Sequence, residues 1–362
     1  MTKVVLAANV LIKGGVWRHV VDLAGGLQAR GCQVAIALPK RASLLRNEAI
    51  GQGLSVHDLA PRSRVDIWHV HLADTYDLQM LAALPLARSL AGAVIITEHL
   101  PRSDASDPSA NQRERSFGAW PAKTVFKRTE YAMCHRVVCV SEASRRFIMI
   151  RYGLDRRKVI AIPNGIEVAA VPTAWPQGSP VFVAIGAVIE QKGFDVLVDA
   201  AEYARTPWQV EVIGDGPHLA TLEARAEERG LPVHFAGVSS DVGSILASAT
   251  ALTAPSRWEA SPYVAMEAME QGRPVVASRV DGFPEIVSDG VTGLLVNPDD
   301  PISLARALDR LAGDPALAES LGRAGRERVK SFSLTGMVDG LLRVYEEALS
   351  TRRWSTAAEC GR

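Results

Sequence analysis

Two runs of short, uninterrupted apolar segments, one in each half of the chain, constrain the fold more than any other feature. The segments are VVLAA, VAIAL, DIWHVH, AVIIT and RVVCVS, then VFVAI, QVEVI, VHFAG, ALTAP and PVVAS. They are rich in β-branched residues, do not alternate with polar residues, and are bounded by Gly, Pro or polar residues, which is typical of strands buried on both faces of a parallel sheet. Helical patterns separate them, for example over residues 16–31 and 194–204. This alternation predicts an α/β protein with one doubly wound sheet in each half.

The length of 362 residues fits two domains of ordinary size. The Pro- and Gly-rich segment IPNGIEVAAVPTAWPQGSP, over residues 162–180, is the natural boundary. We therefore predict an N-terminal domain over 1–170 and a second domain over 171–335. A C-terminal helix and tail, over 336–362, is expected to pack back toward the N-terminal domain, with the last dozen residues frayed. The segment over 100–123 has no periodicity and predicts a lid, a substrate-binding loop or disorder.

The charge is divided unevenly along the chain although Lys+Arg and Asp+Glu both total 40. Residues 1–172 hold 23 basic and 14 acidic residues, a balance of +9, and the remainder has the opposite balance. The basic half can attract an anionic partner and is compatible with a peripheral membrane contact. Its densest basic stretch, over 144–158, reads either as a core-packed helix with a basic face or as a membrane-surface helix. No basic run is typical of a nucleic-acid-binding arm.

Apolar and cysteine content point to a cytoplasmic protein, either free or peripheral to the inner face of the membrane. No run of about 18 apolar residues is present, and the N-terminus lacks a signal-peptide pattern. The four cysteines have no CxxC spacing and no His partners at zinc-finger intervals, so they read as thiols in a reducing compartment.

Three glycine-containing turns follow predicted strands. Gly14-Gly15 precedes a helix, Lys192-Gly193 stands at the start of another, and the DGP sequence at 215–217 suits a turn and helix start. Backbone N–H groups at such turns suit phosphates, although surface turns use the same residues. The Walker lysine pattern and the full GxGxxG fingerprint are absent, which argues against a P-loop kinase and a nicotinamide dehydrogenase.

The stretch RWEASPYVAMEAMEQG contains two glutamates in different contexts. Ser261 is predicted as the N-cap of a helix, with Pro262 at its first position and Gly272 as its stop. Glu259 would then lie in the preceding loop and Glu267 near the second turn, so a dyad sharing one proton is not expected. Carboxylates accept hydrogen bonds from sugar hydroxyls, and first-turn amides suit phosphates. The pattern favours a nucleotide-sugar pocket, with Glu267 as an ordinary helix residue as the alternative.

These motifs resemble the retaining glycosyltransferases of the GT-B fold, closest to family 4 (glycosyl transferases group 1). EASPYVAME fits the E-x7-E motif, and the similarity continues through EAMEQGRPVVASRVDGFPEIVSDGVTGLLVNPDDP. VSEASRR, IPNGIE, QKGFDVLVDA and IGDGP stand upstream in the family's order, and KGGVWRHV and DIWHVH are similar to its acceptor-domain elements. The resemblance covers residues 1–350. It implies two Rossmann-like domains facing a central cleft.

The resemblance also implies roles for individual residues. Glu267 would bind the donor ribose, and Glu259 would face the transferred sugar. Lys192 would neutralise the diphosphate leaving group. The implied donor-binding residues are Gly14, Gly15, Lys192, Ser261, Pro262, Tyr263 and Glu267. The implied catalytic residues are His99, Lys192 and Glu259, while His69 and His71 are equally compatible with structural roles.

One position departs from the family. Ala187 stands where an arginine usually supports the diphosphate, so another cation would have to substitute, and Arg18 and Arg257 are candidates by position. No D-x-D sequence occurs, so neither a bridging metal nor any metal ligand is expected, and no cofactor is expected either.

The implied reaction is transfer of a hexose, with retention, from a nucleoside diphosphate sugar to an acceptor hydroxyl. A UDP-sugar is favoured and a GDP-sugar is the alternative. The acceptor would be a glycan, a lipid-linked molecule or a small alcohol. A catalytically weak nucleotide-sugar-binding protein and a sugar-nucleotide epimerase are the competing interpretations.

Overall fold

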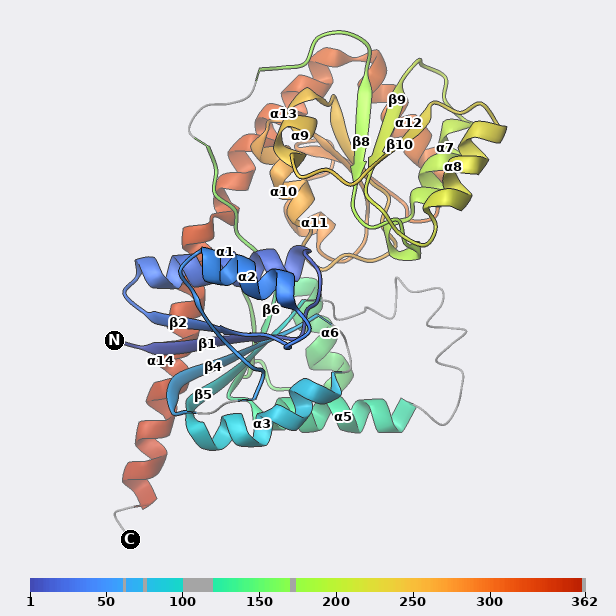
Figure 1. The fold of residues 1–362 in the computed structure, drawn as a ribbon. Helices are drawn as coiled ribbons and strands as arrows, with labels where there is room; N and C mark the ends of the chain where they lie inside the picture. The colour runs from blue at the N-terminus through green and yellow to red at the C-terminus, as the bar shows by residue number, and fades with distance from the viewer. Residues whose placement is uncertain (61–62, 74–76, 100–119, 170–173, 360–362) are drawn as a thin grey trace. The chain divides into compact units, whose positions relative to one another are not determined.

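The computed structural model describes residues 1–60, 63–73, 77–99, 120–169 and 174–359. The described residues form two compact units. The first consists of described residues up to 165 together with those from 334 onward, and the second spans 166–333. Both are three-layer α/β units with all strand pairs parallel (Figure 1).

The first unit contains a seven-stranded sheet in the order β3-β2-β1-β4-β5-β6-β7. Its strands are β1 (Lys3–Ala8), β2 (Gln33–Ala37), β3 (Ser55–His57), β4 (Val65–Leu72), β5 (Ala91–Glu98), β6 (Arg136–Cys139) and β7 (Val159–Ala161). The order runs outward in both directions from β1 and β4. Loops leaving these two strands therefore diverge, and this is the position at which open α/β sheets generally bind ligands.

Two apolar layers cover the sheet of the first unit. On one face pack α1 (Gly15–Ala29), α2 (Ser43–Gly51) and α14 (Leu334–Glu359), which bury Leu6 and Ile95. On the other face pack α3 (Leu78–Leu90), α5 (Trp120–Met133) and α6 (Glu142–Tyr152), which bury Val70 and Ile96. Alternate residues of each strand face opposite layers, so a strand buried on both sides has no polar face.

The second unit contains a six-stranded sheet in the order β10-β9-β8-β11-β12-β13. Its strands are β8 (Val181–Ile185), β9 (Gln209–Ile213), β10 (Val233–Gly237), β11 (Ala251–Ala254), β12 (Val275–Ser278) and β13 (Gly293–Val296). One apolar layer holds α7 (Phe194–Ala201), α8 (Leu219–Glu228), α12 (Pro301–Gly313) and the first part of α13 (Pro315–Val329). The other holds α9 (Val242–Ser248), α10 (Tyr263–Glu270) and α11 (Phe283–Ile286).

The two doubly wound sheets confirm the predicted fold class, and every predicted strand segment forms a strand. Three strands were missed. All three, β3, β7 and β13, are edge strands of only three or four residues. The prediction of a frayed end was wrong for residues 351–359, because α14 continues to Glu359. No Pro or Gly interrupts that segment before Gly361.

The structure can be compared with the predictions for the aperiodic segment over 100–123 and for the basic stretch over 144–158. In the aperiodic segment over 100–123, residues 100–119 lie outside the described residues and 120–123 belong to α5. The basic stretch forms α6, which packs Ile148 and Tyr152 into the core, as expected of a core-packed helix with a basic face. In the part of the chain that the structure describes, no helix is long and apolar enough to cross a membrane.

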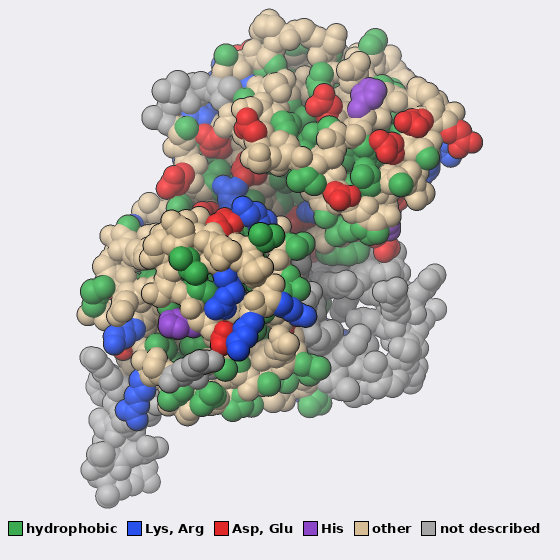
Figure 2. Space-filling model, in the orientation of Figure 1, with side chains coloured by type: hydrophobic (Ala, Val, Ile, Leu, Met, Phe, Trp, Pro, Cys, Tyr) green, Lys and Arg blue, Asp and Glu red, His purple; other side chains and the backbone are tan. Residues whose placement is uncertain are grey.

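The uneven charge of the sequence is visible on the surface. On the face drawn in Figure 2, basic side chains gather over the first unit and acidic side chains over the second. Lys13 and Lys40 are among the exposed cations of the first unit.

Candidate functional site

The predicted donor residues of the second unit lie at the carboxyl ends of β8 and β11. The strand order reverses direction between these two neighbours, so the loops after them diverge. The loop after β8 leads through a 3-10 turn, η1 (Glu190–Lys192), into α7. The loop after β11 carries Glu259 and leads into α10.

An ion pair joins the two loops. Lys192 Nζ lies 2.6 Å from Glu259 Oε2, and both side chains are largely buried, with 20% and 11% of their surface exposed. Gln191 Nε2 donates to the carbonyl oxygen of Trp258 at 3.1 Å and reaches Glu259 Oε2 at 3.5 Å. The structure therefore brings together two predicted catalytic residues, which are 67 positions apart in the sequence.

Glycine is required where η1 meets the end of β11. Gly193 has φ +64°, and an ideal Cβ on it would lie 2.1 Å from the carbonyl oxygen of Pro255. The same holds for the turns after β8 and β9, where a Cβ on Gly214 (φ +154°) would lie 1.8 Å from the carbonyl oxygen of Gly186. A Cβ on Gly186 would lie 3.2 Å from Lys192 Cε, so the Lys192 side chain packs against this turn. Side chains at these glycines would push the loops apart.

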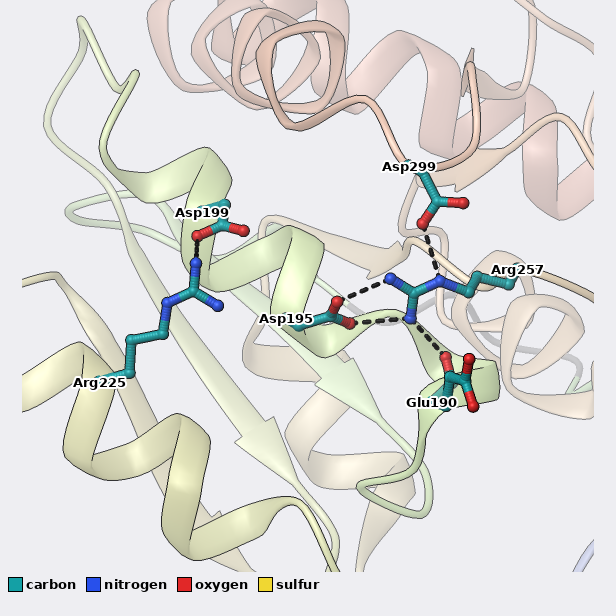
Figure 3. Close-up of polar contacts among 6 residues, drawn as sticks. All are labelled: Glu190, Asp195, Asp199, Arg225, Arg257 and Asp299. Atoms are coloured by element: carbon teal, nitrogen blue, oxygen red, sulfur yellow. Dashed lines mark hydrogen bonds and ion pairs between the residues drawn. The ribbon is translucent and has the colours of Figure 1, made fainter. Parts of the chain in front are cut away.

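Arg257 braces the segment that carries Lys192 (Figure 3). Its guanidinium forms a bidentate pair with Asp195 at 2.9 and 2.7 Å, donates to the carbonyl oxygen of Glu190 at 2.7 Å, and donates through Nε to Asp299 at 2.8 Å. Hydrogen bonding to Asp195 raises the pKa of Arg257 above its usual value. Arg257 is thus committed to acidic and carbonyl partners, which argues against its replacing the arginine missing at Ala187.

The helix after Glu259 begins one residue later than predicted. Pro262, not Ser261, is the N-cap of α10, and Tyr263 is its first residue. Pro262 has φ −73° and ψ 113°, an extended conformation that lies outside the helix. Glu267 is half-buried in the second turn of α10, as predicted.

A second loop supports Glu259 from β12. The backbone N–H of Glu259 donates to Asp281 Oδ2 at 3.1 Å, and the N–H of Gly282 donates to the carbonyl oxygen of Glu259 at 2.9 Å. Asp281 has a left-handed φ of 42°, an uncommon conformation for a residue with a side chain. Sequence reasoning missed Asp281, Gln191 and the bracing role of Arg257, although the DGFPE sequence lay within the recognised signature.

The remaining predicted residues belong to the first unit, whose strand order has a corresponding reversal between β1 and β4. Gly14 is the N-cap of α1 and Gly15 its first residue, so the helix begins one residue earlier than predicted, and no side chain caps it. His99 follows β5 and is 5% exposed. Arg18 lies in α1 and pairs with Asp22 at 3.4 Å.

The four buried histidines of the first unit, His19, His69, His71 and His99, divide into two kinds. His69 is hydrogen-bonded through both ring nitrogens, at 2.7 Å to Tyr345 Oη and 2.7 Å to Thr97 Oγ1, and so ties β4 to β5 and α14. His71 and His99 contact each other through Nδ1 and Nε2 at 3.2 Å, and His19 of α1 packs against both. Burial lowers the pKa of each of these imidazoles, to about 4 for His19. Sequence reasoning did not single out His19.

Comparisons with known proteins cover nearly the whole chain. Residues 167–328 match the family described as glycosyl transferases group 1, and residues 13–170 match glycosyltransferase family 4. The alpha-maltose-1-phosphate synthase of Mycobacterium tuberculosis is 32% identical over 72% of this chain and 76% of its own length. The phosphatidyl-myo-inositol mannosyltransferase of Mycobacterium leprae is 28% identical over 92% of this chain and 93% of its own.

Among solved structures, Anabaena Alr3699/HepE in complex with UDP has a TM-score of 0.78 at 16% identity, and the match covers 96% of this chain and 100% of that one. This likeness concerns the fold. Together with the two parallel-sheet units and the sequence relatives, it establishes the architecture and the class of enzyme. The chain belongs to the GT-B glycosyltransferases of the group 1 and family 4 type.

Proposed function

We propose that this glycosyltransferase moves a hexose from a nucleoside diphosphate sugar to an acceptor hydroxyl with retention of anomeric configuration. A UDP-sugar is the favoured donor and a GDP-sugar the alternative. The observation that carries the proposal is the Lys192–Glu259 pair, which lies at the strand-order reversal of the second unit beside the start of α10. An ammonium group, sugar-directed carboxylates and a helix N-terminus are the groups that a diphosphate sugar requires.

In this mechanism the diphosphate departs against Lys192 and the sugar acquires positive charge. Donor phosphates would draw the ammonium of Lys192 away from Glu259, which would free that carboxylate for the hydroxyls of the transferred sugar. Glu267 would bind the ribose, and the backbone at Ser261, Pro262 and Tyr263 would contact the donor. Stabilisation of the leaving group supplies the rate enhancement. A double displacement through Glu259 is disfavoured, because that carboxylate is expected at the hydroxyls of the transferred sugar.

Roles for Gly14 and Gly15 at the diphosphate, and for His99 beside the reacting sugar, rest on the family resemblance. Acceptors of three kinds are proposed: a glycan, a lipid-linked molecule or a small alcohol. The proposed setting is the cytoplasm, either free or in peripheral contact with the inner face of the membrane through the basic half. Sedimentation with anionic vesicles at low and high salt distinguishes the two.

The test of the donor site is a panel of UDP- and GDP-sugars, scored for binding and for slow hydrolysis without acceptor. Glu259→Gln should lower turnover by about 10²–10³-fold, in line with the loss of one preorganised electrostatic contact. Glu228→Gln is the matched control, since Glu228 is exposed at the end of α8 in the same unit. Near-normal turnover in Glu259→Gln contradicts the assignment, and release of an isomerised donor without acceptor would indicate an epimerase.

Ala187 motivates a second candidate, a catalytically weak protein that binds nucleotide sugars. Ala187 is exposed in the loop after β8, so a longer side chain can be introduced without disturbing the core. A large rise in turnover for Ala187→Arg would indicate a degraded site. Unchanged turnover alongside measurable wild-type transfer would indicate that other groups stabilise the diphosphate.

A further inference from the structure

Among the residues that the structure describes, two with a side chain have a left-handed backbone. They are Asp281, with φ 42°, and Asp299, with φ 54°. Glycine adopts this conformation without steric cost, whereas a residue with a Cβ is disfavoured there, aspartate less than most. Such residues persist where the surrounding structure requires them, and they gather at functional sites.

Both aspartates direct their carboxylates to the same short segment, residues 257–259, which follows β11. Asp281 Oδ2 accepts a hydrogen bond from the backbone N–H of Glu259 at 3.1 Å. Asp299 Oδ1 accepts one from Arg257 Nε at 2.8 Å (Figure 3). The two aspartates lie in different loops, after β12 and after β13, so their shared target is not a consequence of one turn.

The segment that carries Glu259 has no helix or strand of its own and is held by its neighbours. On one side, the carbonyl oxygen of Gln191 accepts from the N–H of Arg257 at 2.8 Å. On the other side, the N–H of Gly282 donates to the carbonyl oxygen of Glu259 at 2.9 Å. Asp281 and Gly282 thus bind both backbone polar groups of Glu259. Because these groups belong to the two peptide planes around its Cα, they also fix the direction of its Cα–Cβ bond.

The loop that supplies these two contacts is itself anchored. Val280 and Phe283, which flank the pair, are 5% and 1% exposed and belong to an apolar layer of the second unit. An ideal Cβ on Gly282 would lie 1.9 Å from the carbonyl oxygen of Ala260, so the two loops are in direct backbone contact. Asp281 therefore stands on a rigid support, which a residue that orients another one requires.

We propose that Asp281 is a positioning residue for sugar transfer, which holds the backbone of Glu259 so that its carboxylate stays directed at the transferred sugar. The left-handed backbone is retained at Asp281 because it aims that side chain at the N–H of Glu259. Glycine would relax the backbone but remove the acceptor, whereas asparagine would keep both the tolerance for this conformation and an acceptor oxygen. The inference rests on the role proposed for Glu259.

The experiment uses the full chain and whichever UDP- or GDP-sugar of the panel is hydrolysed fastest. Asp281→Gly should lower kcat about 10–100-fold with a smaller change in KM, because a reacting group displaced by about 1 Å loses mainly transition-state stabilisation. Asp281→Asn should retain most of the wild-type kcat. Asp309→Ala is the matched control. Asp309 accepts from the N–H groups of Arg205 and Thr206 at 3.1 Å, at the opposite, amino edge of the same sheet, so its loss should lower stability and leave kcat unchanged.

A double-mutant cycle tests whether Asp281 acts through Glu259. In the Glu259→Gln background, Asp281→Gly should lower kcat by a clearly smaller factor than in the wild type, and fully additive effects would overturn the inference. Normal turnover in Glu259→Gln would contradict the proposed function itself. A strong effect of Glu259→Gln with none of Asp281→Gly would overturn only the positioning role.

Hydrogen exchange gives an answer that does not depend on the donor. Exchange of the peptide that contains Glu259 should be faster in Asp281→Gly and unchanged in Asp281→Asn. The melting temperature of Asp281→Gly should stay within about 4 °C of the wild type, because relief of the left-handed strain offsets the lost hydrogen bond. Unchanged exchange in Asp281→Gly would show that this carboxylate does not hold Glu259, and the inference would fail.

Discussion

The buried cation Lys127 is the most informative position at which to test how charge is accommodated in the first unit. It lies in α5, 1% exposed, and its Nζ donates at 2.6 Å to both Glu98 of β5 and Glu130 of α5. Tyr131 also donates to Glu98, at 2.8 Å. Burial alone would lower the pKa of Lys127, but the attraction of the two carboxylates outweighs it and raises the pKa.

One cation shared by two carboxylates leaves an excess negative charge in the core. Burial, together with the repulsion of Glu98 and Asp77, raises the pKa of Glu130 from 4.5 to about 7 despite the attraction of Lys127. A raised carboxyl pKa contributes stability that is present below pH 4.5 and is lost as the pH rises through 7. The shift corresponds to about 3 kcal/mol over that window.

Lys127→Met removes the cation and leaves both carboxylates buried. We expect a loss of about 3–5 kcal/mol at pH 8, the usual cost of breaking a buried ion pair from one side. At pH 5.5 the loss should be clearly smaller, because a proton can replace the missing ammonium. The double variant with Glu130→Gln should recover part of the loss at pH 8.

Urea unfolding measures this effect, with the midpoint at pH 8 expected to fall by about 1–3 M. Hydrogen exchange of peptides from β5 and α5 assigns the change to the first unit rather than the second. Lys158→Met is a control on the same unit, because Lys158 is half-buried outside this cluster. Equal losses at the two pH values, or a loss below about 1 kcal/mol at pH 8, would refute the reasoning.

Three further outcomes follow from the geometry. Gly214→Ala should lower the free energy of unfolding of the second unit by more than about 2 kcal/mol, because the new Cβ clashes with the carbonyl oxygen of Gly186. Gly243→Ala in α9 should instead raise it by about 0.5–1 kcal/mol. Calorimetry that ranks the two variants the other way would contradict the close approach of Gly214 to Gly186. Arg257→Ala should weaken UDP binding in titration calorimetry, because the turn that carries Lys192 loses its contacts with Arg257. Arg257→Lys should not restore the affinity, since lysine cannot form the bidentate pair with Asp195. Full affinity in either variant would argue against this supporting role of Arg257. Acidification from pH 7 to 5 should lower the free energy of unfolding by about 2 kcal/mol from His19 alone, because its lowered pKa leaves the unfolded chain binding more protons over this range. A His19→Gln variant with the same acid sensitivity would contradict this.

Local sequence determined which segments become strands and where several helices begin. Uninterrupted β-branched runs can only be buried on both faces, and so they predicted two parallel sheets before any contact was known. Gly14 and Gly193 each mark a helix start, because backbone conformation at a helix end depends on the residues there. The short strands β3, β7 and β13 escaped prediction, since three or four residues carry little periodicity and their pairing comes from neighbouring strands.

Tertiary structure alone decided which side chains meet. The pairing of Lys192 with Glu259 follows from the adjacency of β8 and β11, which are not consecutive in the chain. The contact of Tyr345 with His69 spans 276 positions and exists because α14 returns to the first sheet. The convergence of His19, His71 and His99 likewise depends on β1 and β4 being neighbours. Strand order is set by the burial of whole helical layers, a property of the complete chain that no single motif contains.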